Sequence, residues 1–181
     1  TEINDTNYTI ITVSKRLAAS GGIIGLNGAT SSTGLSLGYN TSTVMRHAQY
    51  ANWVNLVVEA YDASTELPTI VAGQFNESVG KTAWRIRDGV NNTRTGTNRT
   101  HYFLPGTGRI GRGSANNGFT GYIAEVIMYN RTLSALELKQ IHTYLSVKYG
   151  LSVPAADHLY ALDATYQNDI FGIGMQASSL L

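Results

Sequence analysis

Short apolar segments that alternate with polar residues recur through most of this 181-residue chain. They cover residues 8–14, 21–26, 53–61, 69–75, 81–87 and 121–130, and glycine, asparagine and serine separate them. Side chains alternate between the two faces of a strand, so each segment is typical of a strand with one face turned to a core. No strand–helix–strand rhythm is visible. The pattern therefore predicts an all-β, antiparallel β-sandwich rather than a parallel α/β sheet.

Apolar residues occupy both alternating positions in residues 121–130, the clearest of these segments. This predicts a central strand that is buried on both faces. Gly118 and Gly121 stand near its start, where their conformational freedom allows a tight turn. By contrast, residues 29–49 and 88–100 are rich in Ser, Thr, Asn and Gly, which predicts two long polar loops that interrupt the strands.

One helix is predicted, over residues 135–149. Ser134 is the expected N-cap, and Glu137 three residues later completes a capping box. Gly150 supplies the left-handed residue that ends the helix. An apolar stripe at helical spacing is expected to pack the helix on the outside of the sandwich. Its main residues are Leu138, Ile141 and Leu145.

The main domain is expected to span residues 1–153 and to include the helix. Residues 158–163 and 170–173 have the pattern of two more short strands. Residues 154–181 are therefore expected to begin a small following module or to form a C-terminal extension.

The composition narrows the range of partners. Charged residues make up only 14% of the chain, against about 25% in typical soluble domains, and the net charge is +1. We therefore expect no nucleic-acid partner, because that binding rests on neutralising phosphates. No apolar run reaches about 18 residues, so no membrane insertion is expected. The chain has no cysteine, which excludes disulfides and thiolate metal sites.

Residues 118–134, GFTGYIAEVIMYNRTLS, resemble the closing strand of laminin-G-like, concanavalin A-like lectin and glucanase domains. That strand often carries an F-x-G-x-I-A-E-V-x-x-Y-N-R-x-L-S string. Residues 145–151, LSVKYGL, are similar to the helix end of bacterial members. Residues 166–174, YQNDIFGIG, resemble a segment that follows this domain in large surface proteins of Bacteroidetes-type bacteria. The resemblance implies a concanavalin A-like jelly roll with one peripheral C-terminal helix, located outside the cell or on its surface.

The start of the chain departs from this family. Residues 8–117 agree with it only in strand pattern, and neither the opening W-L-x-A-like string nor the W-x-D-x-S-G-N-like segment occurs before Tyr8. The resemblance therefore implies that the first strand or strands are missing. We expect an upstream segment of the same polypeptide or a neighbouring copy to supply them, because a sheet edge readily accepts an added strand.

No catalytic constellation is found. Glucanases of this fold carry E-x-D-x-x-E or E-x-D-x-E on one strand, and the chain contains neither string. Glu59 and Asp62 stand three residues apart, which predicts opposite faces of a solvated strand end. No histidine pair has the spacing of a helical zinc site, and the G-x-G-x-x-G match at residues 106–111 is interpreted as a turn and strand entry. We therefore expect no enzyme activity.

Calcium is the one cofactor that the sequence leaves open. Asp163, Asn168 and Asp169 could supply oxygen ligands for it. They lack the acidic density of a loop site, so an Asx-type turn is the favoured interpretation.

Carbohydrate sites combine an aromatic platform with side chains that form hydrogen bonds. Candidates lie in the second polar segment and on either side of it: Trp84, Arg85, Arg87, Asn91, Asn92, Arg94, Asn98 and Tyr102. Further candidate platforms are Tyr39, Tyr50 and Trp53.

Two functions from different classes follow. The first is a non-catalytic extracellular binding or adhesion module that recognises a glycan or a surface protein through its loops. The second is a structural subunit of a surface fibre or filament, assembled by strand and loop contacts between copies of the chain.

Overall fold

The computed structural model describes residues 7–27, 33–41, 44–51, 55–60, 68–76, 82–87, 90–94, 108–113, 118–151, 153 and 158–159. The chain divides into two compact units, Thr1–Leu133 and Ser134–Leu181. The domain boundary expected after residue 153 stays a prediction. His158 and Leu159 form a bend, and the remainder of the two strands expected after residue 157 lies outside the described residues.

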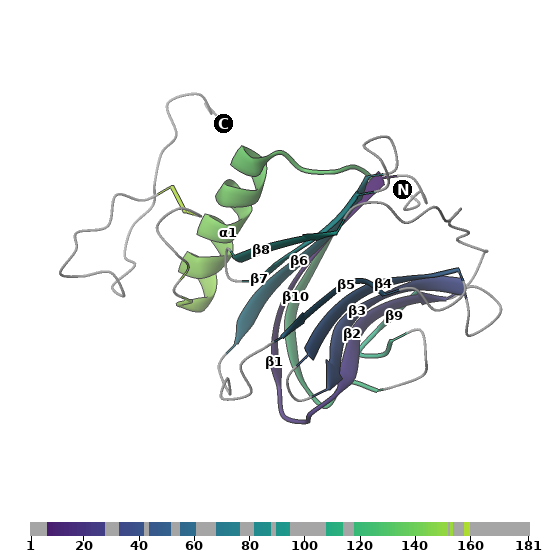
Figure 1. The fold of residues 1–181 in the computed structure, drawn as a ribbon. Helices are drawn as coiled ribbons and strands as arrows, with labels where there is room; N and C mark the ends of the chain where they lie inside the picture. The colour runs from purple at the N-terminus through teal and green to yellow at the C-terminus, as the bar shows by residue number, and fades with distance from the viewer. Residues whose placement is uncertain are drawn as a thin grey trace. The chain divides into compact units, whose positions relative to one another are not determined.

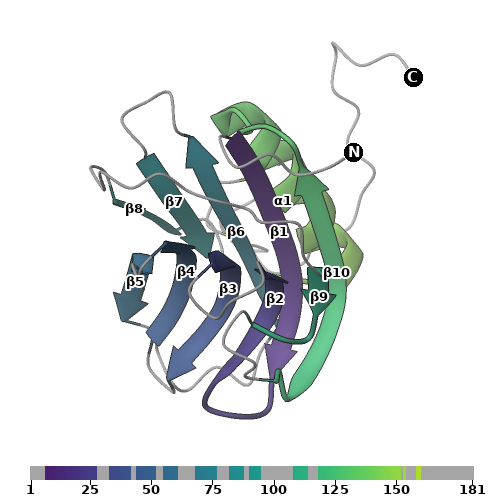
Figure 2. The same cartoon turned by 90° about the vertical axis from the view of Figure 1, so that its right-hand side faces the viewer.

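The first unit contains two antiparallel sheets of five strands each (Figure 1). Sheet A has the order β10 (Gly121–Tyr129), β1 (Asn7–Arg16), β6 (Thr69–Asn76), β7 (Thr82–Arg87) and β8 (Val90–Arg94). Sheet B has the order β5 (Asn55–Ala60), β4 (Val44–Ala51), β3 (Thr33–Thr41), β2 (Gly21–Asn27) and β9 (Gly108–Ile110). The view of Figure 2 shows both strand orders across the sandwich. The predicted all-β, antiparallel sandwich is confirmed.

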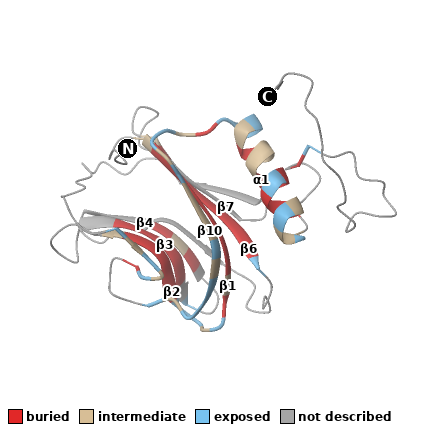
Figure 3. Cartoon of the chain, turned by 180° about the vertical axis from the view of Figure 1, so that it is seen from behind, coloured by how far each residue is buried: buried red, intermediate tan, exposed pale blue. Residues whose placement is uncertain are grey.

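The core lies between the two sheets. Its buried side chains come from β1, β2, β3, β4 and β6 and are Tyr8, Ile10, Ile23, Ile24, Leu35, Leu37, Tyr39, Met45, Val71 and Phe75. β1 and β6 are buried along almost their whole length, shown in red in Figure 3. Both strands have a neighbouring strand on each side, so neither presents an edge to solvent.

The segment after β10 covers part of the outer face of sheet A. The Thr9 hydroxyl donates a 2.8 Å hydrogen bond to the carbonyl of Arg131. Gln74 Nε2 donates to the Thr9 hydroxyl at 3.1 Å and to the carbonyl of Leu133 at 3.3 Å. These polar side chains are buried but bonded, as buried polar groups usually are. They identify Thr9 and Gln74 as outward-facing residues of sheet A.

The strand over residues 121–129 forms as predicted, but its expected central, doubly buried position is wrong. β10 is the edge strand of sheet A and pairs with β1 among the described strands. Tyr122 is 65% exposed and Met128 is 38% exposed. Apolar residues on both faces predicted burial on both sides, yet an edge strand leaves part of such a surface uncovered. The backbone also approaches another segment closely at Gly121, because a Cβ there would collide with the carbonyl oxygen of Lys15.

The two long polar loops are also corrected. Residues 33–41 and 44–51 form β3 and β4, and residues 90–94 form β8. In β3, Leu35, Leu37 and Tyr39 are core residues that alternate with small or polar ones. The segment therefore has the alternation of a strand, although its composition is typical of a loop. The short β9 confirms the strand entry expected from the glycine-rich match before residue 111.

The second unit contains the helix α1 (Ala135–Tyr149), at the predicted bounds. Ser134 and Glu137 form the expected capping box, and Gly150 ends the helix with a φ of 63°. Leu138 and Leu145 are buried, whereas Ile141 is half-buried. Packing of the helix on the sandwich stays a prediction. Among the described residues, no helix has the length and apolar character needed to cross a bilayer.

Candidate ligand-binding site

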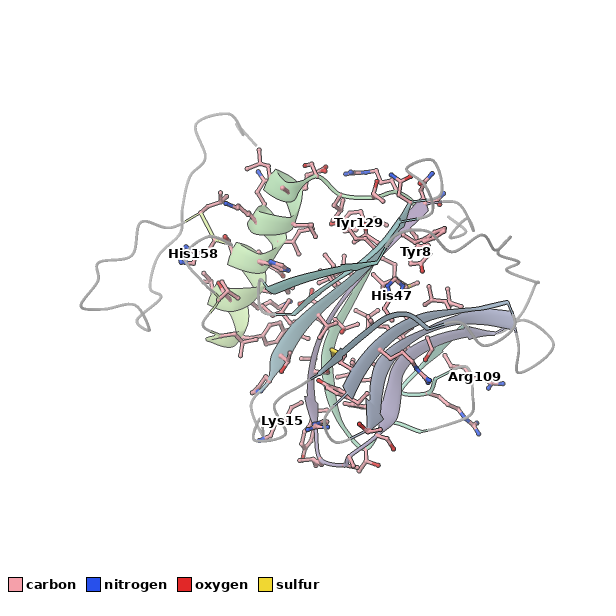
Figure 4. All side chains as sticks on the ribbon, viewed as in Figure 1. Tyr8, Lys15, His47, Arg109, Tyr129 and His158 are labelled. Carbon is pink, nitrogen blue, oxygen red and sulfur yellow. The ribbon has the colours of Figure 1, made fainter. Side chains whose placement is uncertain are left out.

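A buried polar pair joins the two sheets. The Tyr8 hydroxyl of β1 and Nε2 of His47 on β4 are 2.8 Å apart and hydrogen-bonded, and both residues are fully buried (Figure 4). Their rings meet edge to face with centroids 5.8 Å apart. Gly73 of β6 leaves room for the imidazole, since a Cβ at Gly73 would stand 3.2 Å from His47 Nδ1. His47 and Gly73 therefore face each other across the interior of the sandwich.

This contact establishes which positions of β7 face the interior. Arg85 pairs with Gly73, and Arg87 pairs with the core residue Val71. Directly paired residues lie on the same face of a sheet. Positions 85 and 87 therefore face sheet B. Trp84 pairs instead with the outward-facing Gln74, which assigns position 84 to the outer face.

β8 continues the same face. β7 ends at Arg87 and β8 begins at Val90, and these two residues pair, so the connection consists of Asp88 and Gly89. Asp-Gly is a strong signal for a two-residue hairpin turn. Asn92 pairs with Arg85 and therefore faces inward.

The next residues of β8 complete the assignment. Arg94 pairs with Ala83, which itself pairs with the core residue Phe75, so position 94 also faces inward. Asn91 pairs with Ile86 and falls on the outer face with Trp84.

β5 of sheet B faces this hairpin. It contacts both β7 and β8. Val57 pairs with His47, and Glu59 pairs with the buried Met45, so positions 57 and 59 face inward. The inward-facing polar positions of β5, β7 and β8 are hereafter the inner polar positions: Glu59, Arg85, Arg87, Asn92 and Arg94.

The candidate residues predicted from the sequence therefore divide into groups. Those on the inward face are Arg85, Arg87, Asn92 and Arg94. Trp84 and Asn91 occupy outward-facing positions, whereas Asn98 and Tyr102 lie outside the described residues. Their role in ligand binding stays a prediction.

Sequence reasoning did not identify Glu59, or the buried pair Tyr8 and His47, as residues of interest. The pairing of Glu59 with Met45 gives position 59 an inward-facing place in the sheet. The solvation expected for Glu59 stays a prediction, because the structure does not describe its side chain. Asp62, its proposed neighbour on the other face, lies outside the described residues. The alternation of residues on both sides of Asp88-Gly89 could have revealed the site. A two-residue turn there puts positions 85, 87, 92 and 94 on one face of the hairpin.

Tyr39 is wrong as a sugar platform. It is only 2% exposed, its ring stacks on Phe119 at 6.1 Å, and the Arg16 guanidinium lies 5.0 Å above it. Trp53 lies outside the described residues, and Tyr50 lies on β4.

Metal binding has no support in the described part of the chain. There, no three His, Cys, Asp or Glu residues gather into a group that could hold a metal ion. The calcium candidates Asp163, Asn168 and Asp169 lie outside the described residues, so calcium stays a prediction.

The fold is similar to solved β-sandwich domains of the lectin-like type. The carbohydrate-binding module CBM40 of the Ruminococcus gnavus IT-sialidase, bound to α2,6-sialyllactose, matches with a TM-score of 0.57 and 13% identity. The match covers 74% of this chain and 81% of that module. A heptameric SAP-like pentraxin from Limulus polyphemus matches with a TM-score of 0.57 and 15% identity, over 78% of this chain and 70% of the pentraxin.

An enzyme is also among the matches. The sialidase of Trypanosoma rangeli, in complex with sialic acid, matches with a TM-score of 0.53 and 16% identity, over 80% of this chain. The match spans only 23% of that enzyme. No family model matches the sequence, and no curated protein matches it. At this identity the comparisons establish a lectin-like β-sandwich, and the laminin-G or concanavalin A-like resemblance holds at that level.

Proposed function

We propose that the chain is a non-catalytic, extracellular glycan-binding module whose ligand contacts the β7–β8 hairpin. One observation carries this proposal: the strand register gathers Arg85, Arg87, Asn92 and Arg94 on a single face opposite β5. Arginine and asparagine supply several hydrogen-bond donors each, which suits the hydroxyl and acidic groups of sugars. The saccharide ligands named for the Ruminococcus and Trypanosoma proteins support a glycan as the ligand class.

Adjacent residues of β8 provide a matched test. Asn92→Ala alters an inner polar position, and Asn91→Ala makes the same chemical change on the opposite face of the same strand. On a glycan array, the unmodified chain should bind a defined set of glycans saturably, and Asn92→Ala should weaken that binding about tenfold, as loss of one good hydrogen bond would. Asn91→Ala should bind as the unmodified chain does. If no glycan on the array binds saturably to the unmodified chain, the proposal is overturned.

Catalysis is tested on the same ligands. Retaining glycosidases need two carboxyl groups about 5–5.5 Å apart. Glu59 is the one acidic residue among the inward-facing positions of the described strands. We therefore expect no sugar product when bound glycans or β-glucans are incubated with the chain. Turnover that disappears in Glu59→Gln would contradict the non-catalytic assignment.

The edge strand β10 favours a second function. In it the chain is a structural subunit that adds a strand from another segment or copy. This edge strand is nine residues long, carries Glu125 as its single charge, and exposes Tyr122 and Met128. Long, weakly charged edge strands are templates for strand addition. Regular self-assembly that Ala124→Pro on β10 abolishes, without glycan binding, would favour this function over the first.

A further inference from the structure

The edge strand β10 leaves inward-facing apolar residues partly exposed. β10 has a described neighbouring strand on one side only, and Figure 2 shows it at the outer edge of sheet A. The structure describes every residue of β10, and none of them is buried. Met128 pairs with the core residue Ile10, so it faces the interior, yet it is 38% exposed. Such an edge is a ready template for another strand.

A bulge limits the part of β10 that can pair regularly with a further strand. The register with β1 shifts between Val13 and Ser14, where Ala124 is an extra residue in β10. Bulges disrupt the ladder locally and bend the strand. The regular part of β10 therefore consists of residues 125–129 and has Ile127 at its centre. It is hereafter the regular edge segment.

The regular edge segment is complementary to a second copy of itself. Antiparallel pairing of two copies about its centre places three kinds of pair opposite each other: Ile127 with itself, Val126 with Met128, and Glu125 with Tyr129. Alternate residues of a strand share a face, so each pair joins residues of the same face, as direct cross-strand pairs do. The exposed Met128 of one copy is then covered by Val126 of the second copy.

Charge favours this register over its neighbours. Glu125 is the single charged residue of β10. Pairing centred on Glu125 would place two glutamates directly opposite, which is destabilising, and pairing centred on Val126 would leave them as diagonal neighbours about 7–8 Å apart. Pairing about Ile127 instead brings Glu125 opposite Tyr129 of the second copy. The Arg131 guanidinium lies 5.7 Å from the centre of the Tyr129 ring in each copy, so positive charge stands close to this glutamate.

We propose that two copies of the chain associate through their β10 strands, antiparallel about Ile127, so that their A sheets form one continuous sheet. A twofold contact of this kind closes at two copies, so it yields a dimer rather than a filament. This inference rests on strand addition at β10, the second function above, and narrows it to a second copy and a closed pair. It does not depend on glycan binding, because the β7–β8 hairpin lies at the opposite edge of sheet A.

Sedimentation velocity of the full chain measures the association. A short ladder gives a small interface, so the unmodified chain should convert from monomer to dimer only as its concentration rises from about 1 to about 500 µM. Ile127→Lys places two positive charges directly opposite at the twofold axis and should leave the chain monomeric over that range. Ile110→Lys is the matched control, because it makes the same change at an exposed residue of β9, the edge strand of sheet B. This control should dimerise as the unmodified chain does.

A charge exchange tests the register. Glu125→Arg and Arg131→Glu should each weaken the dimer about fivefold or more, because each brings like charges together twice in the twofold contact. The double variant should recover most of the affinity, since it restores the pair with reversed signs. A role of Glu125 within one copy alone would not give this recovery of dimer affinity.

A cysteine at the twofold axis tests the contact directly. The chain has no cysteine, so a single introduced one can form a disulfide only with another copy. Under a mild oxidant, Ile127→Cys should form disulfide-linked dimers, because directly opposite residues have Cβ atoms about 4.5–5.5 Å apart. Tyr122→Cys should cross-link much more slowly, although Tyr122 is 65% exposed, because the register does not place it opposite itself.

The outcomes separate this inference from the functions proposed above. A chain that stays monomeric up to about 500 µM would overturn the dimer, and so would faster cross-linking of Tyr122→Cys than of Ile127→Cys. An unchanged dimer in Ile127→Lys, shown by thermal melting to be folded, would overturn it as well. Filaments in place of dimers would overturn the closed pair but leave strand addition at β10 intact. None of these results alters the glycan-binding proposal.

Discussion

The interior of the sandwich has two halves that differ in their residues. They are hereafter the apolar half, at β1, β2 and β3, and the polar half, at β7 and β8. Inward-facing positions of β1, β2 and β3 carry residues such as Ile10, Ile24 and Leu37, all buried. Inward-facing positions of β7 and β8 carry Arg85, Arg87, Asn92 and Arg94 instead. Apolar burial stabilises a fold, whereas polar groups between sheets cost free energy unless they are bonded. We therefore expect the first half to provide stability and the second to carry the proposed recognition of a ligand.

The largest effect on stability should come from the apolar half. Ile10→Ala removes a fully buried side chain from the centre of the core and should lower the free energy of unfolding by about 2–5 kcal/mol. Asn92→Ala, in the polar half, should lower it by less than about 1 kcal/mol. Urea denaturation measures both. Equal losses in the two halves would remove the distinction between them.

The boundary between the halves is tested at Gly73. Gly73→Ala places a methyl group 3.2 Å from the His47 ring and should cost about 1–3 kcal/mol. The matched control is Gly118→Ala, since a Cβ at Gly118 meets nothing within 4 Å. In a His47→Ala background, the same Gly73→Ala change should cost much less, as a double-mutant cycle would show. An unchanged cost would mean that His47 does not lie over Gly73.

The polar pair at this boundary should contribute a smaller amount. Tyr8→Phe keeps the ring but removes the hydroxyl that is bonded to His47 Nε2, which should cost about 1 kcal/mol. Tyr122→Phe removes a hydroxyl from a residue that is 65% exposed and should change stability by less than about 0.5 kcal/mol. If the two variants unfold alike, the hydrogen bond across the sandwich contributes little.

The smallest effect is expected in the polar half. Arg85→Gln should lower stability by no more than about 0.5 kcal/mol, because the ligand-binding interpretation gives Arg85 no role in the stability of the fold. A loss of about 3–5 kcal/mol would instead show that Arg85 is one partner of a buried ion pair that the fold requires. Glu59→Gln would then cause a similar loss, and the ligand-binding interpretation of these residues would be replaced by a structural one.

The fold could be predicted largely from the sequence because its signals are local. The alternation of apolar and polar residues predicts β1, β6 and β10. The ends of the helix are determined by hydrogen bonds within a few residues, at Ser134, Glu137 and Gly150. Sheet order is not local. The apolar pattern of β10 is compatible with a central strand, and only its pairing with β1 reveals an edge.

The candidate site was only partly predictable for the same reason. Composition drew attention to Arg85, Arg87, Asn92 and Arg94, but not to the face that each occupies. A shift of the register by one residue would exchange the inward and outward sets, and the register depends on strands far apart in the sequence. Glu59 joins the arginines only through the pairing of β5 with β4.

A crystal structure of the chain with the tightest glycan from the array tests the central claim most directly. The account predicts ligand oxygens within hydrogen-bonding distance of Asn92 and of at least two of Arg85, Arg87 and Arg94. A ligand bound on the outer face at Trp84 and Asn91, or along the β10 edge, would contradict it.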